Sequence, residues 1–543
     1  MMQGTGSTEL RAENREQGLG TREQGSGTID PVTQHHEGAP SISAFSAEMG
    51  GNATALLSCQ IDREQGTVAR HIHLSGICGT AMASLAGLLQ LQGHRITGSD
   101  KAAYPPMSDQ LREMGITVLE PYAEANLDPA PDLVVIGNAL SRGNPEVERV
   151  LDERIPFTSM AALLHEEFLP GRESLVVAGT HGKTTTTSML AWIYQVAARQ
   201  NPALEPSFLI GGVAENFGSS YQLRPTRTFI VEGDEYDTAF FDKGPKFLHY
   251  FPDGLILTHV EFDHADIYAD LAAVKTAFKR LVNLVPRRGL IVAYDGSANV
   301  GECVQNAFCR VQRYGFAATS DWQIRNLRHL DGLTRWEVWR AGELWAELAM
   351  RLAGEHNALN ATAAAALAFG HGIPLDAIQT ALAEFKSVKR RLEVRAQING
   401  VTIIEDFAHH PTAIRETLRA LRSVYPQSRL WAVLEPRSNT LRRKVLEGDL
   451  IQSLRLADQV VLAAVYQQQR IPEAERLSPE AVVDALNAAG TPAELCPDVE
   501  AIIAYLTPRL QPGDVVAILS NGGFDGIYEK LPARLRQLVE RPA

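Results

Sequence analysis

Short apolar runs alternate along most of this chain with longer stretches in which apolar residues recur at helical spacing. Runs of this length that are apolar at nearly every position, and that end in glycine or a polar residue, indicate strands buried on both faces. Strands that alternate with helices predict parallel sheets and the α/β fold class. The predicted strands are 71–75, 95–98, 132–138, 174–178, 228–231, 254–258, 289–293, 401–405, 430–434, 459–464 and 515–519.

The predicted helices fall between these strands and divide the chain into three α/β domains. Helical spacing covers 80–92, 357–370, 375–385, 411–422, 479–489 and 499–510, and a last helix runs toward the C-terminus. The length of 543 residues agrees with three domains of about 100–200 residues each. We expect an N-terminal Rossmann-like domain, a central domain and a C-terminal Rossmann-like domain over 70–170, 171–388 and 389–543, with 155–171 as the first crossing.

The first 69 residues have a different composition, dominated by Gly, Gln, Glu, Ser and Thr. The tetrapeptide Arg-Glu-Gln-Gly occurs at 15–18, 22–25 and 63–66. Such a segment has too little apolar surface to offset the entropy lost on ordering. We predict a disordered extension over 1–69. No residue in it supports the alternative, a regulatory arm.

The amino-acid composition argues against some classes of binding partner. Hydrophobic residues make up 45% of the chain and charged residues 21%, and the formal net charge is −13, which argues against nucleic acid or an anionic membrane as partner. The cysteines form no zinc or Cys-x-x-Cys pattern, and no apolar run approaches the roughly 20 residues of a membrane helix. We therefore expect a cytoplasmic protein without membrane insertion.

A glycine turn follows the strand 174–178 and opens a helix, which is the arrangement of a phosphate-binding loop. Backbone N–H groups of such a turn point at phosphate oxygens, a lysine adds charge, and a threonine hydroxyl can bind Mg²⁺. The plain alternative, a glycine turn with a surface lysine, does not explain why strand, turn and helix agree. The loop residues are Gly179, Thr180, His181, Gly182, Lys183, Thr184 and Thr185.

Two acidic clusters follow predicted strands of the central domain, at 232–237 and 261–266. Ligands gather at the carboxyl ends of strands in doubly wound sheets, and Mg²⁺ prefers carboxylate oxygens beside nucleotide phosphates. Either cluster alone is more simply interpreted as an acidic loop in water. Two of them downstream of a phosphate-binding loop favour a metal site, with His264 beside the second cluster.

The N-terminal strand–helix–strand unit contains a partial dinucleotide fingerprint. Gly76 and Gly79 lie at the turn into the helix, and Asp100 follows the second strand. This layout can place a pyrophosphate at a helix N-terminus and a ribose near the carboxylate. The leading glycine of the full fingerprint is missing, so by itself a tight turn explains the pattern better.

Taken together, these motifs resemble the ATP-dependent Mur ligases of peptidoglycan metabolism over about residues 71–532. Several motifs in a fixed order are far more specific than any single one. The matching motifs are Gly76–Gly79 with Gly98–Asp100, Gly179–Thr185, Glu232–Asp237, Asp263–Asp266, Gly354–Asn357 with Asn360, Arg391, and Asp406–Pro411. The resemblance implies a UDP-binding domain, a central P-loop ATPase sheet and a peptide-binding domain.

The resemblance also implies an ADP-forming ligase that uses ATP and Mg²⁺. A carboxylate attacks the γ-phosphate of ATP, and an amine then displaces phosphate from the acyl phosphate. The implied catalytic residues are Lys183, His264 and Arg391, and the implied metal ligands are Thr184, Glu232 and His264.

The remaining implied contacts divide among the three substrates. Beyond the phosphate-binding loop, ATP would contact His356, Asn357, Asn360 and Asp406, and the UDP moiety would contact Gly76, Gly79 and Asp100. The peptide would contact Arg437, Ser438, Asn439 and Asn521.

Within the family, the sequence is most similar to the ligases that join UDP-N-acetylmuramate to the recycled murein tripeptide L-alanyl-γ-D-glutamyl-meso-diaminopimelate. The UDP-N-acetylmuramate–L-alanine ligases are the runner-up and usually lack the segment 241–250. The features that favour the tripeptide are Tyr104–Met107, Ile136–Pro145, Phe241–Tyr250, and Glu435–Thr440 with Ser520–Phe524.

Some positions depart from the family pattern. Phe278 falls nearest the carbamoylated lysine of several members, with Lys275 and Lys279 beside it, so we expect no carbamate. His259 replaces a usual asparagine, and Asp525 replaces an expected glycine beside the peptide site.

Two other classes remain as alternatives. A nicotinamide dehydrogenase would leave the phosphate-binding loop and both acidic clusters without a role. A non-catalytic nucleotide-binding partner protein would lose metal or amine-site residues, whereas Glu232, His264, Arg391 and Arg437 are present. The sequence favours a monomer and leaves the oligomeric state open.

Overall fold

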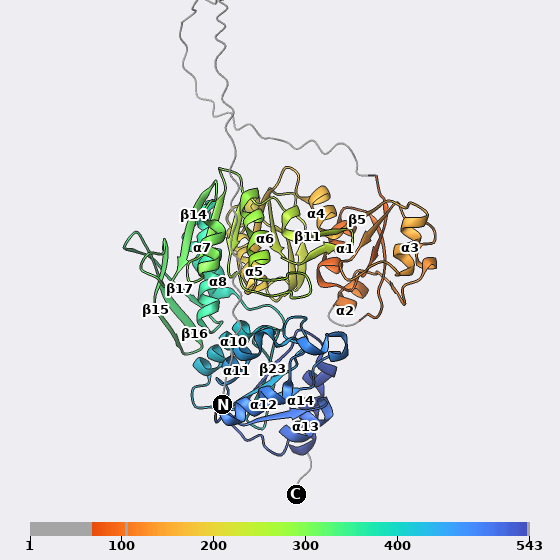
Figure 1. The fold of residues 1–543 in the computed structure, drawn as a ribbon. Helices are drawn as coiled ribbons and strands as arrows, with labels where there is room; N and C mark the ends of the chain where they lie inside the picture. Colours follow the sequence, from red (N-terminus) through yellow and green to blue (C-terminus); the bar gives the residue numbers. More distant parts are fainter. Residues whose placement is uncertain (1–67, 104–106, 540–543) are drawn as a thin grey trace, which may run out of the picture. The chain divides into compact units, whose positions relative to one another are not determined.

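The computed structural model describes residues 68–103 and 107–539. The predicted extension therefore lies outside the described residues except for residues 68 and 69, and so does most of the segment Tyr104–Met107. The described residues confirm the mixed α/β class (Figure 1).

The N-terminal sheet is parallel throughout and has the strand order β3-β2-β1-β4-β5. The three strands predicted here are confirmed, and two short edge strands are added to them. The stretch predicted as a crossing holds β5 and α4. The strands are β1 His71–Ser75, β2 Arg95–Ser99, β3 Val118–Leu119, β4 Leu133–Ile136 and β5 Phe157–Ser159; the helices are α1 Thr80–Leu91, α2 Met107–Glu113, α3 Pro145–Asp152, α4 Met160–Phe168 and the 3₁₀ turn η1 Glu124–Leu127.

A buried carboxylate ties the carboxyl ends of these strands together. Glu146, in the first turn of α3, accepts hydrogen bonds from Ser75 Oγ at 2.5 Å, Ser99 Oγ at 2.6 Å and Asn126 Nδ2 at 2.8 Å. Burial alone would raise the pKa of Glu146, but these donors and His73 lower it to about 2. The charged carboxylate therefore fixes the strand ends from which the first glycine turn starts.

The central sheet has the strand order β17-β16-β15-β14-β13-β12-β6-β9-β7-β8. The strands from β15 to β7 in this order pair in parallel, and the sheet is extended by antiparallel β16 and β17 at one end and β8 at the other. A separate hairpin is formed by β10 Asp237–Ala239 and β11 Asp242–Pro245. The strands are β6 Glu173–Ala178, β7 Ser207–Ala214, β8 Ser219–Gln222, β9 Thr228–Gly233, β12 Gly254–Leu257, β13 Leu290–Tyr294, β14 Arg310–Gly315, β15 Trp322–Leu330, β16 Leu333–Arg340 and β17 Glu343–Met350.

Helices cover both faces of the parallel part of this sheet. They are α5 Lys183–Ala197, α6 Leu271–Leu284, α7 Ala298–Val304, α8 Glu355–Gly370 and α9 Leu375–Glu384, with 3₁₀ turns η2 Pro202–Leu204 and η3 Lys246–His249. Leu175 and Val177 of β6 pack with α5, α8 and α9, whereas Val176 and Ala178 pack with α6. Because both faces of β6 are buried, its residues form a continuous apolar run in the sequence.

The strands β15 to β17, which pair with one another in antiparallel fashion, were missed by the sequence prediction. Arginine and glutamate alternate with buried residues such as Trp336 and Val338 there, because one face of this extension is open to water. A half-buried strand has no continuous apolar run, and the prediction depended on such runs. Figure 1 shows these strands beside α8.

The C-terminal sheet has the order β18-β19-β23-β20-β21-β22, with only β18 antiparallel. All four strands predicted here are confirmed, and β18 and β22 at the two edges are additions. The strands are β18 Glu393–Ile398, β19 Val401–Asp406, β20 Leu430–Leu434, β21 Gln459–Ala463, β22 Ala493–Cys496 and β23 Val515–Leu519; the helices are α10 Pro411–Val424, α11 Glu447–Leu454, α12 Pro479–Ala488, α13 Val499–Leu506 and α14 Ile527–Val539, with 3₁₀ turns η4 Lys444–Leu446, η5 Gln468–Arg470, η6 Glu473–Glu475 and η7 Phe524–Gly526.

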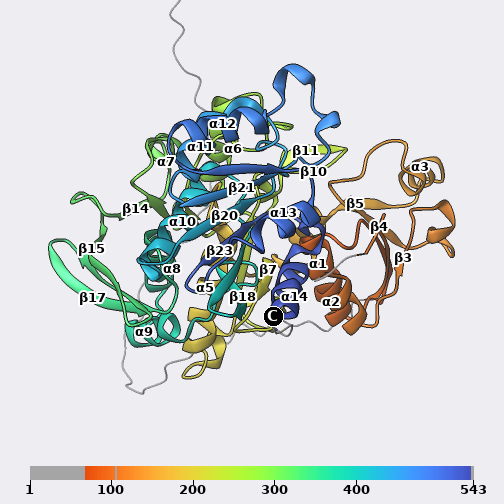
Figure 2. The ribbon, with the colours of Figure 1, turned by 90° about the horizontal axis from the view of Figure 1, so that it is seen from below.

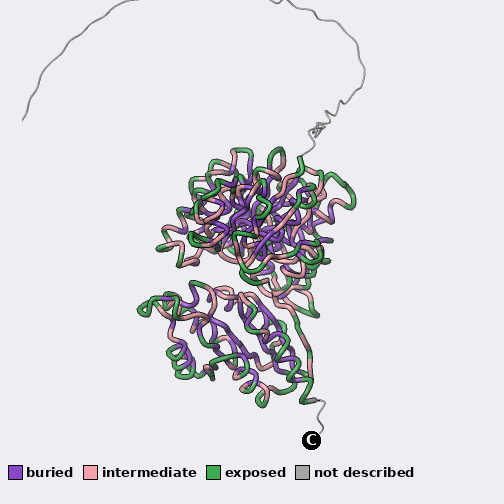
Figure 3. Tube along the Cα trace, turned by 90° about the vertical axis from the view of Figure 1, so that its right-hand side faces the viewer, coloured by how far each residue is buried: buried purple, intermediate pink, exposed green. Residues whose placement is uncertain are grey.

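Each face of the C-terminal sheet has its own core. Leu430, Ala432 and Leu434 of β20 pack with α10, α11 and α12, whereas Trp431 and Val433 pack with α13 and α14 (Figure 2). Buried residues gather in the interior of the fold, and exposed residues lie mostly along its outside (Figure 3). The predicted domain limits at residues 170 and 388 stay predictions.

None of the described helices combines the length and the apolar character that a membrane crossing requires.

Candidate functional site

The predicted phosphate-binding loop has the backbone geometry that this role needs. It joins β6 to α5, and Gly179 and Gly182 have φ values of 134° and 79°. A Cβ atom on Gly179 would lie 2.1 Å from Thr258 Oγ1. Only glycine fits there, because the turn is both left-handed and tightly packed. The helix N-terminus at the end of this turn is a suitable site for phosphate oxygens.

Lys183 is held in place by two acceptors. Its Nζ donates to Gly179 O at 2.8 Å and to Glu235 Oε2 at 2.7 Å. Burial lowers the pKa of Lys183, but Glu235 and Asp234 outweigh burial and raise it. The ammonium therefore stays charged beside the loop that we expect to bind phosphate.

Glu235 also holds His264, so one buried carboxylate positions two cationic groups. His264 Nε2 lies 3.3 Å from Glu235 Oε1. Burial lowers the pKa of His264, but the hydrogen bond and charge of Glu235 raise it to about 9. Burial raises the pKa of Glu235, whereas Lys183 and His264 lower it to about 2. Two of the three predicted catalytic residues thus lie together through Glu235, a member of the acidic cluster 232–237 to which the sequence analysis gave no role of its own.

Thr184 and Glu232 meet as a magnesium site requires. Thr184 Oγ1 donates to Glu232 Oε1 at 2.8 Å, and Glu232 Oε2 accepts from Gly211 N at 2.6 Å. Burial and the neighbouring Asp234 raise the pKa of Glu232. A cation would offset this penalty on the charged form, and both side chains offer oxygen, the ligand atom that Mg²⁺ prefers. The residues present therefore fit the ion.

A cavity of about 410 Å³ adjoins one side of the loop. The predicted ATP residues His181, Gly182, Thr185, His356, Asn357, Asn360 and Asp406 border it, and so does Arg391, which was predicted to be catalytic. His356 Nδ1 is buried without a hydrogen-bond partner among the described residues. An unpaired buried ring nitrogen of this kind, which donates or accepts according to the tautomer, suits a polar atom of a ligand. The sequence motifs did not single out Tyr294, Thr412 or Glu416, which border the same cavity.

Asp406 is already engaged by the protein. Its Oδ2 accepts from Leu392 N at 2.8 Å, and its Oδ1 accepts from Ala408 N at 2.9 Å and Thr417 Oγ1 at 3.1 Å. Asp406 therefore braces the connection that carries Arg391. Contact with a ribose stays a prediction.

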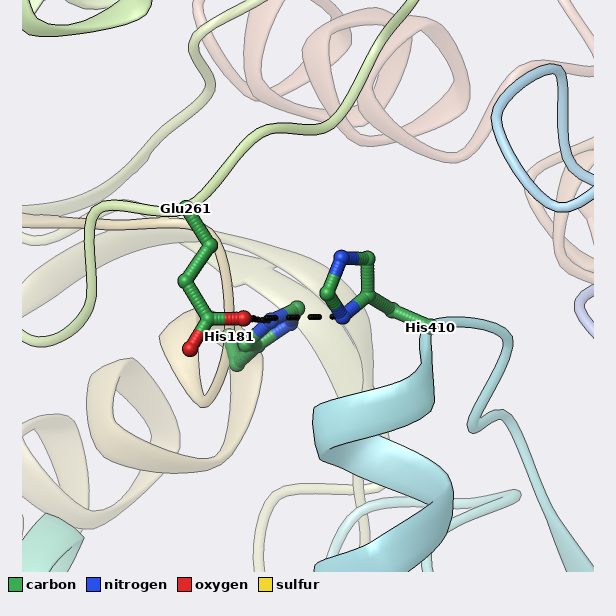
Figure 4. Close-up of side chains that lie close together, drawn as sticks. All are labelled: His181, Glu261 and His410. Atoms are coloured by element: carbon green, nitrogen blue, oxygen red, sulfur yellow. Dashed lines mark hydrogen bonds and ion pairs between the residues drawn. The ribbon is translucent and has the colours of Figure 1, made fainter. Parts of the chain in front are cut away.

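His181, Glu261 and His410 form a cluster that joins the phosphate-binding loop to the start of α10 (Figure 4). Glu261 Oε2 lies 3.0 Å from His181 Nε2 and 3.6 Å from His410 Nδ1, and it accepts from Thr412 Oγ1 at 2.7 Å. Burial lowers the pKa of His181 to about 4. Burial raises the pKa of Glu261, but His181 and Thr412 lower it to about 2.

The predicted UDP residues are divided between two roles. Gly79 borders a second cavity of about 430 Å³, together with Lys183, Glu232 and His264. Asp100 instead braces the glycine turn, since its Oδ2 accepts from Cys78 N at 2.9 Å and its Oδ1 lies 3.2 Å from Tyr122 Oη. Gly76, with a φ of 86°, forms the turn itself.

Arg437, the predicted peptide anchor, is clamped on several sides. Its guanidinium carbon lies 3.8 Å from the centroid of the Tyr466 ring, and its Nη1 lies 3.2 Å from Glu435 Oε1. A Cβ atom on Gly522 would lie 2.1 Å from Arg437 Nε. A guanidinium held between a ring and a backbone is oriented before any ligand arrives.

The other predicted peptide residues differ in what they contact. Asn521 borders the second cavity, and its Oδ1 is buried without a partner in the described residues. Ser438 Oγ donates to His409 O at 3.3 Å, and Asn439 Nδ2 donates to Asp266 Oδ2 at 2.7 Å. Asn521 is therefore the one best placed for a ligand, whereas Ser438 and Asn439 hold the turn.

Comparison with protein-family models matches three consecutive regions of this chain. Residues 71–169 match the Mur ligase family catalytic domain, residues 177–368 the Mur ligase middle domain, and residues 390–522 the Mur ligase glutamate ligase domain. The chain belongs to the Mur ligase family. The family resemblance predicted from the motifs is confirmed.

The proteins similar to this chain include two kinds of Mur ligase, to which it is similar to different degrees. The chain is 44% identical to the UDP-N-acetylmuramate–L-alanyl-γ-D-glutamyl-meso-2,6-diaminoheptandioate ligase of Escherichia coli, over 86% of this chain and 99% of that protein. It is 30% identical to a UDP-N-acetylmuramate–L-alanine ligase of Alkaliphilus metalliredigens, over 83% and 95%. A crystal structure of a murein peptide ligase from Psychrobacter arcticus matches with a TM-score of 0.67 and 36% identity, over 88% of this chain and 100% of that one.

The positions that depart from the Mur ligase pattern have ordinary structural surroundings. Phe278 is buried with its ring 5.2 Å from Phe247, and Lys275 and Lys279 each lie 2.7 Å from Glu302. The His259 ring lies 4.6 Å from the Tyr294 ring. Asp525 Oδ2 accepts from Lys530 at 3.0 Å. Neither lysine borders the two cavities, and the absence of a carbamate stays a prediction.

Proposed function

We propose that this Mur ligase joins UDP-N-acetylmuramate to the tripeptide L-alanyl-γ-D-glutamyl-meso-diaminopimelate, with conversion of ATP to ADP and phosphate. The supporting observation is the second cavity. Residues of the N-terminal domain (Gly79), of the phosphate-binding loop (Lys183) and of the C-terminal domain (Asn521) all border it. A cavity bordered by all three domains allows each domain to bring its own substrate to one common reaction centre.

The chemistry follows from the charges in this cavity. The lactyl carboxylate of the sugar attacks the γ-phosphorus of ATP, and the bond to the ADP oxygen breaks. Two anions must approach each other, so cations have to lie beside the transferred phosphoryl group. Lys183 and His264 supply charge there, and both are fixed by Glu235 before the substrates bind.

Magnesium, held by Thr184 and Glu232, would neutralise further charge on the phosphates. The predicted role of His264 as a further ligand stays a prediction, and it requires the imidazole to give up the proton that Glu235 stabilises. Arg391 borders both cavities, and its guanidinium lies 5.1 Å from the Phe407 ring. It is therefore placed to contact phosphate from the C-terminal side of the connection.

The second step transfers the acyl group. The free amine of the alanyl residue attacks the acyl carbon, a C–N bond forms, and phosphate leaves with the activated oxygen. The amine gives up a proton in this step. Exclusion of water protects the acyl phosphate until the amine arrives.

The choice of the tripeptide over L-alanine rests on Arg437 and on the higher identity to the E. coli relative. The clamped guanidinium can bind a carboxylate of diaminopimelate through two parallel hydrogen bonds. L-alanine is too short to present such a group. Because ATP and a UDP-linked sugar are cytoplasmic metabolites, we place the reaction in peptidoglycan recycling in the cytoplasm.

The decisive experiment measures phosphate release by the full-length enzyme with ATP, Mg²⁺ and UDP-N-acetylmuramate. L-alanine and the tripeptide are compared as amine substrates, and the product is identified by mass. We expect kcat/KM for the tripeptide to exceed that for L-alanine by at least about 10³, because alanine forgoes the contact with Arg437 and the other peptide contacts. Equal use of both amines would favour the L-alanine ligase.

A further inference from the structure

A buried lysine in the second cavity has no role in the mechanism above. Lys246 begins η3 in the segment 241–250, and only 5% of it is exposed. Its ammonium makes no hydrogen bond to the protein wherever the chain is described. The nearest charged group is Asp234 Oδ2 at 3.9 Å, which is too far for a hydrogen bond.

The surroundings of Lys246 fix it beside the reaction centre. Lys246 N donates to Tyr236 O at 3.3 Å, and Phe247 N donates to Asp234 O at 3.2 Å, so η3 is tied to the loop that carries Glu235. Lys246 Nζ lies 4.2 Å from the Tyr236 ring centroid, and the His264 ring lies 5.3 Å from the same ring. Lys246 and His264 therefore lie around one tyrosine.

A buried ammonium whose N–H groups meet no hydrogen-bond acceptor is unfavourable. Burial lowers the pKa of Lys246, in opposition to Asp234 and Glu232. Removing one charge from water costs several kcal/mol unless it is paired and hydrogen-bonded. An anionic ligand with free oxygen acceptors would supply what this group lacks.

The other lysine and arginine side chains at this cavity are bonded to the protein, exposed or, like the half-buried Arg391, already assigned to phosphate in the proposed mechanism. Lys183 is bound to Gly179 O and Glu235, as described above. Arg390 donates to Glu405 and to the carbonyl oxygens of Ser520 and Gly522. Lys389 is exposed. Lys246 is thus the buried cation that is left for a further anion.

We propose that Lys246 binds the carboxylate that is phosphorylated, and then the acyl phosphate formed from it. This inference rests on the proposed function. Lys246 donates hydrogen bonds to an oxygen of the nucleophile throughout, stays protonated and transfers no proton. It offsets the repulsion between the carboxylate and the γ-phosphate from the side of the acceptor, as Lys183 does from the side of ATP.

The test compares Lys246→Met with Lys246→Arg. Steady-state assays with ATP, UDP-N-acetylmuramate and the tripeptide give each KM. A rapid-quench assay without tripeptide measures the acyl phosphate, trapped by borohydride reduction. We expect Lys246→Met to raise the KM for UDP-N-acetylmuramate at least about tenfold and to lower the trapped acyl phosphate by a similar factor. The dissociation constant of a non-hydrolysable ATP analogue should change by less than about twofold. Lys246→Arg, which keeps the charge, should show only part of the effects of Lys246→Met.

Lys243→Met is the matched control, because Lys243 lies in the same segment, is exposed and pairs with Asp237. It should behave as wild type. If Lys246→Met does not fold, Lys246→Gln, which keeps a hydrogen-bond donor, replaces it. An unchanged KM for UDP-N-acetylmuramate would overturn the proposal. An equal loss of affinity for ATP, or a change only in the Mg²⁺ concentration that the enzyme requires, would overturn it as well. If wild type forms no ADP in response to UDP-N-acetylmuramate, the proposed function fails instead.

Discussion

At the scale of single residues, the centre is organised by one carboxylate between two cations. Glu235 lies 2.7 Å from Lys183 and 3.3 Å from His264, and it is itself buried. Fixed charges of this kind need no reorganisation when negative charge moves during the reaction. Substitutions at these positions should therefore reduce turnover more than they reduce stability.

Lys183→Ala and Thr184→Ala should each lower kcat by about 10²–10³, the usual loss for one preorganised electrostatic contact. In the proposed site, the first would remove charge at the transferred phosphoryl group, and the second would remove a magnesium ligand. Stopped-flow measurement of ADP release and thermal melting check both effects. Lys279→Ala, which removes a lysine on the surface of α6, is the control. A Lys183→Ala enzyme of near wild-type rate would refute the phosphate-binding assignment.

Arg437→Lys should raise the KM for the tripeptide by the equivalent of about 1.5–3 kcal/mol, which is the worth of a hydrogen bond to a charged group. Lysine keeps the charge but loses the planar fork that the Tyr466 ring and Gly522 hold in place. The KM values for ATP and UDP-N-acetylmuramate should barely move. Arg443→Lys, nearby and paired with Glu475, is the control. Equal weakening of all three substrates would return Arg437 to a structural role.

At the scale of elements, the loop 261–266 connects two parts of the site. Thr440 Oγ1 donates to Asp263 Oδ1 at 2.5 Å, and the same oxygen accepts from His264 N at 2.7 Å. His264 has a φ of 54°, a left-handed conformation that needs such support. The turn that holds Arg437 is thereby linked through Asp263 and His264 to Glu235 and Lys183.

Thr440→Val should lower kcat by about one to two orders of magnitude, because the carboxylate of Asp263 loses a hydrogen bond worth about 1.5–3 kcal/mol and His264 loses its support. The KM for ATP should change little. The ratio of ADP to amide product should rise, since ATP would be cleaved without productive transfer. Thr440→Ser keeps the hydroxyl and should restore both values. A loss of stability with an unchanged ratio would show that Thr440 only packs.

The Glu146 network offers a prediction about stability and pH. Its folded pKa of about 2 lies below the ordinary 4.5, so the carboxylate stabilises the fold above pH 4.5 and loses this effect as pH falls toward 2. Glu146→Gln should cost about 3 kcal/mol at pH 7, a value that follows from the size of the pKa shift. Chemical denaturation of both proteins should show the difference shrinking below pH 4.5. A difference that is constant with pH would mean that packing causes the loss.

The sequence predicted most of the parallel strands and the phosphate-binding loop because both depend on residues close in the chain. Gly179 and Lys183 serve one turn, and the apolar run of β6 is buried on both faces. The contact between Asp263 and Thr440 joins residues 177 positions apart, so no pattern of neighbouring residues predicts it. Lys246 lies inside a segment that the sequence marks as distinctive, but burial without a partner can be seen only in three dimensions.

At the scale of the whole molecule, the ligase fold accounts for the chain from residue 71 onward. The family models match from residue 71, and the alignment with the E. coli relative covers 99% of that protein but only 86% of this chain. The family models thus leave the residues before 71 unmatched. The composition of residues 1–66 gives no apolar periodicity with which to pack against the three domains.

Deleting residues 1–66 should therefore leave activity and melting temperature unchanged. The truncated protein starts just before β1, so every strand of the N-terminal sheet is kept. Steady-state kinetics with all three substrates and calorimetry of both proteins give the comparison, and a truncation at residue 76, which removes β1, is the control that should not fold. A melting temperature lower by more than about 2 °C, roughly the effect of 2 kcal/mol in a protein of this size, would show that the segment packs. An altered KM at unchanged stability would show that it regulates, because it would then act on the substrate sites without contributing to the fold.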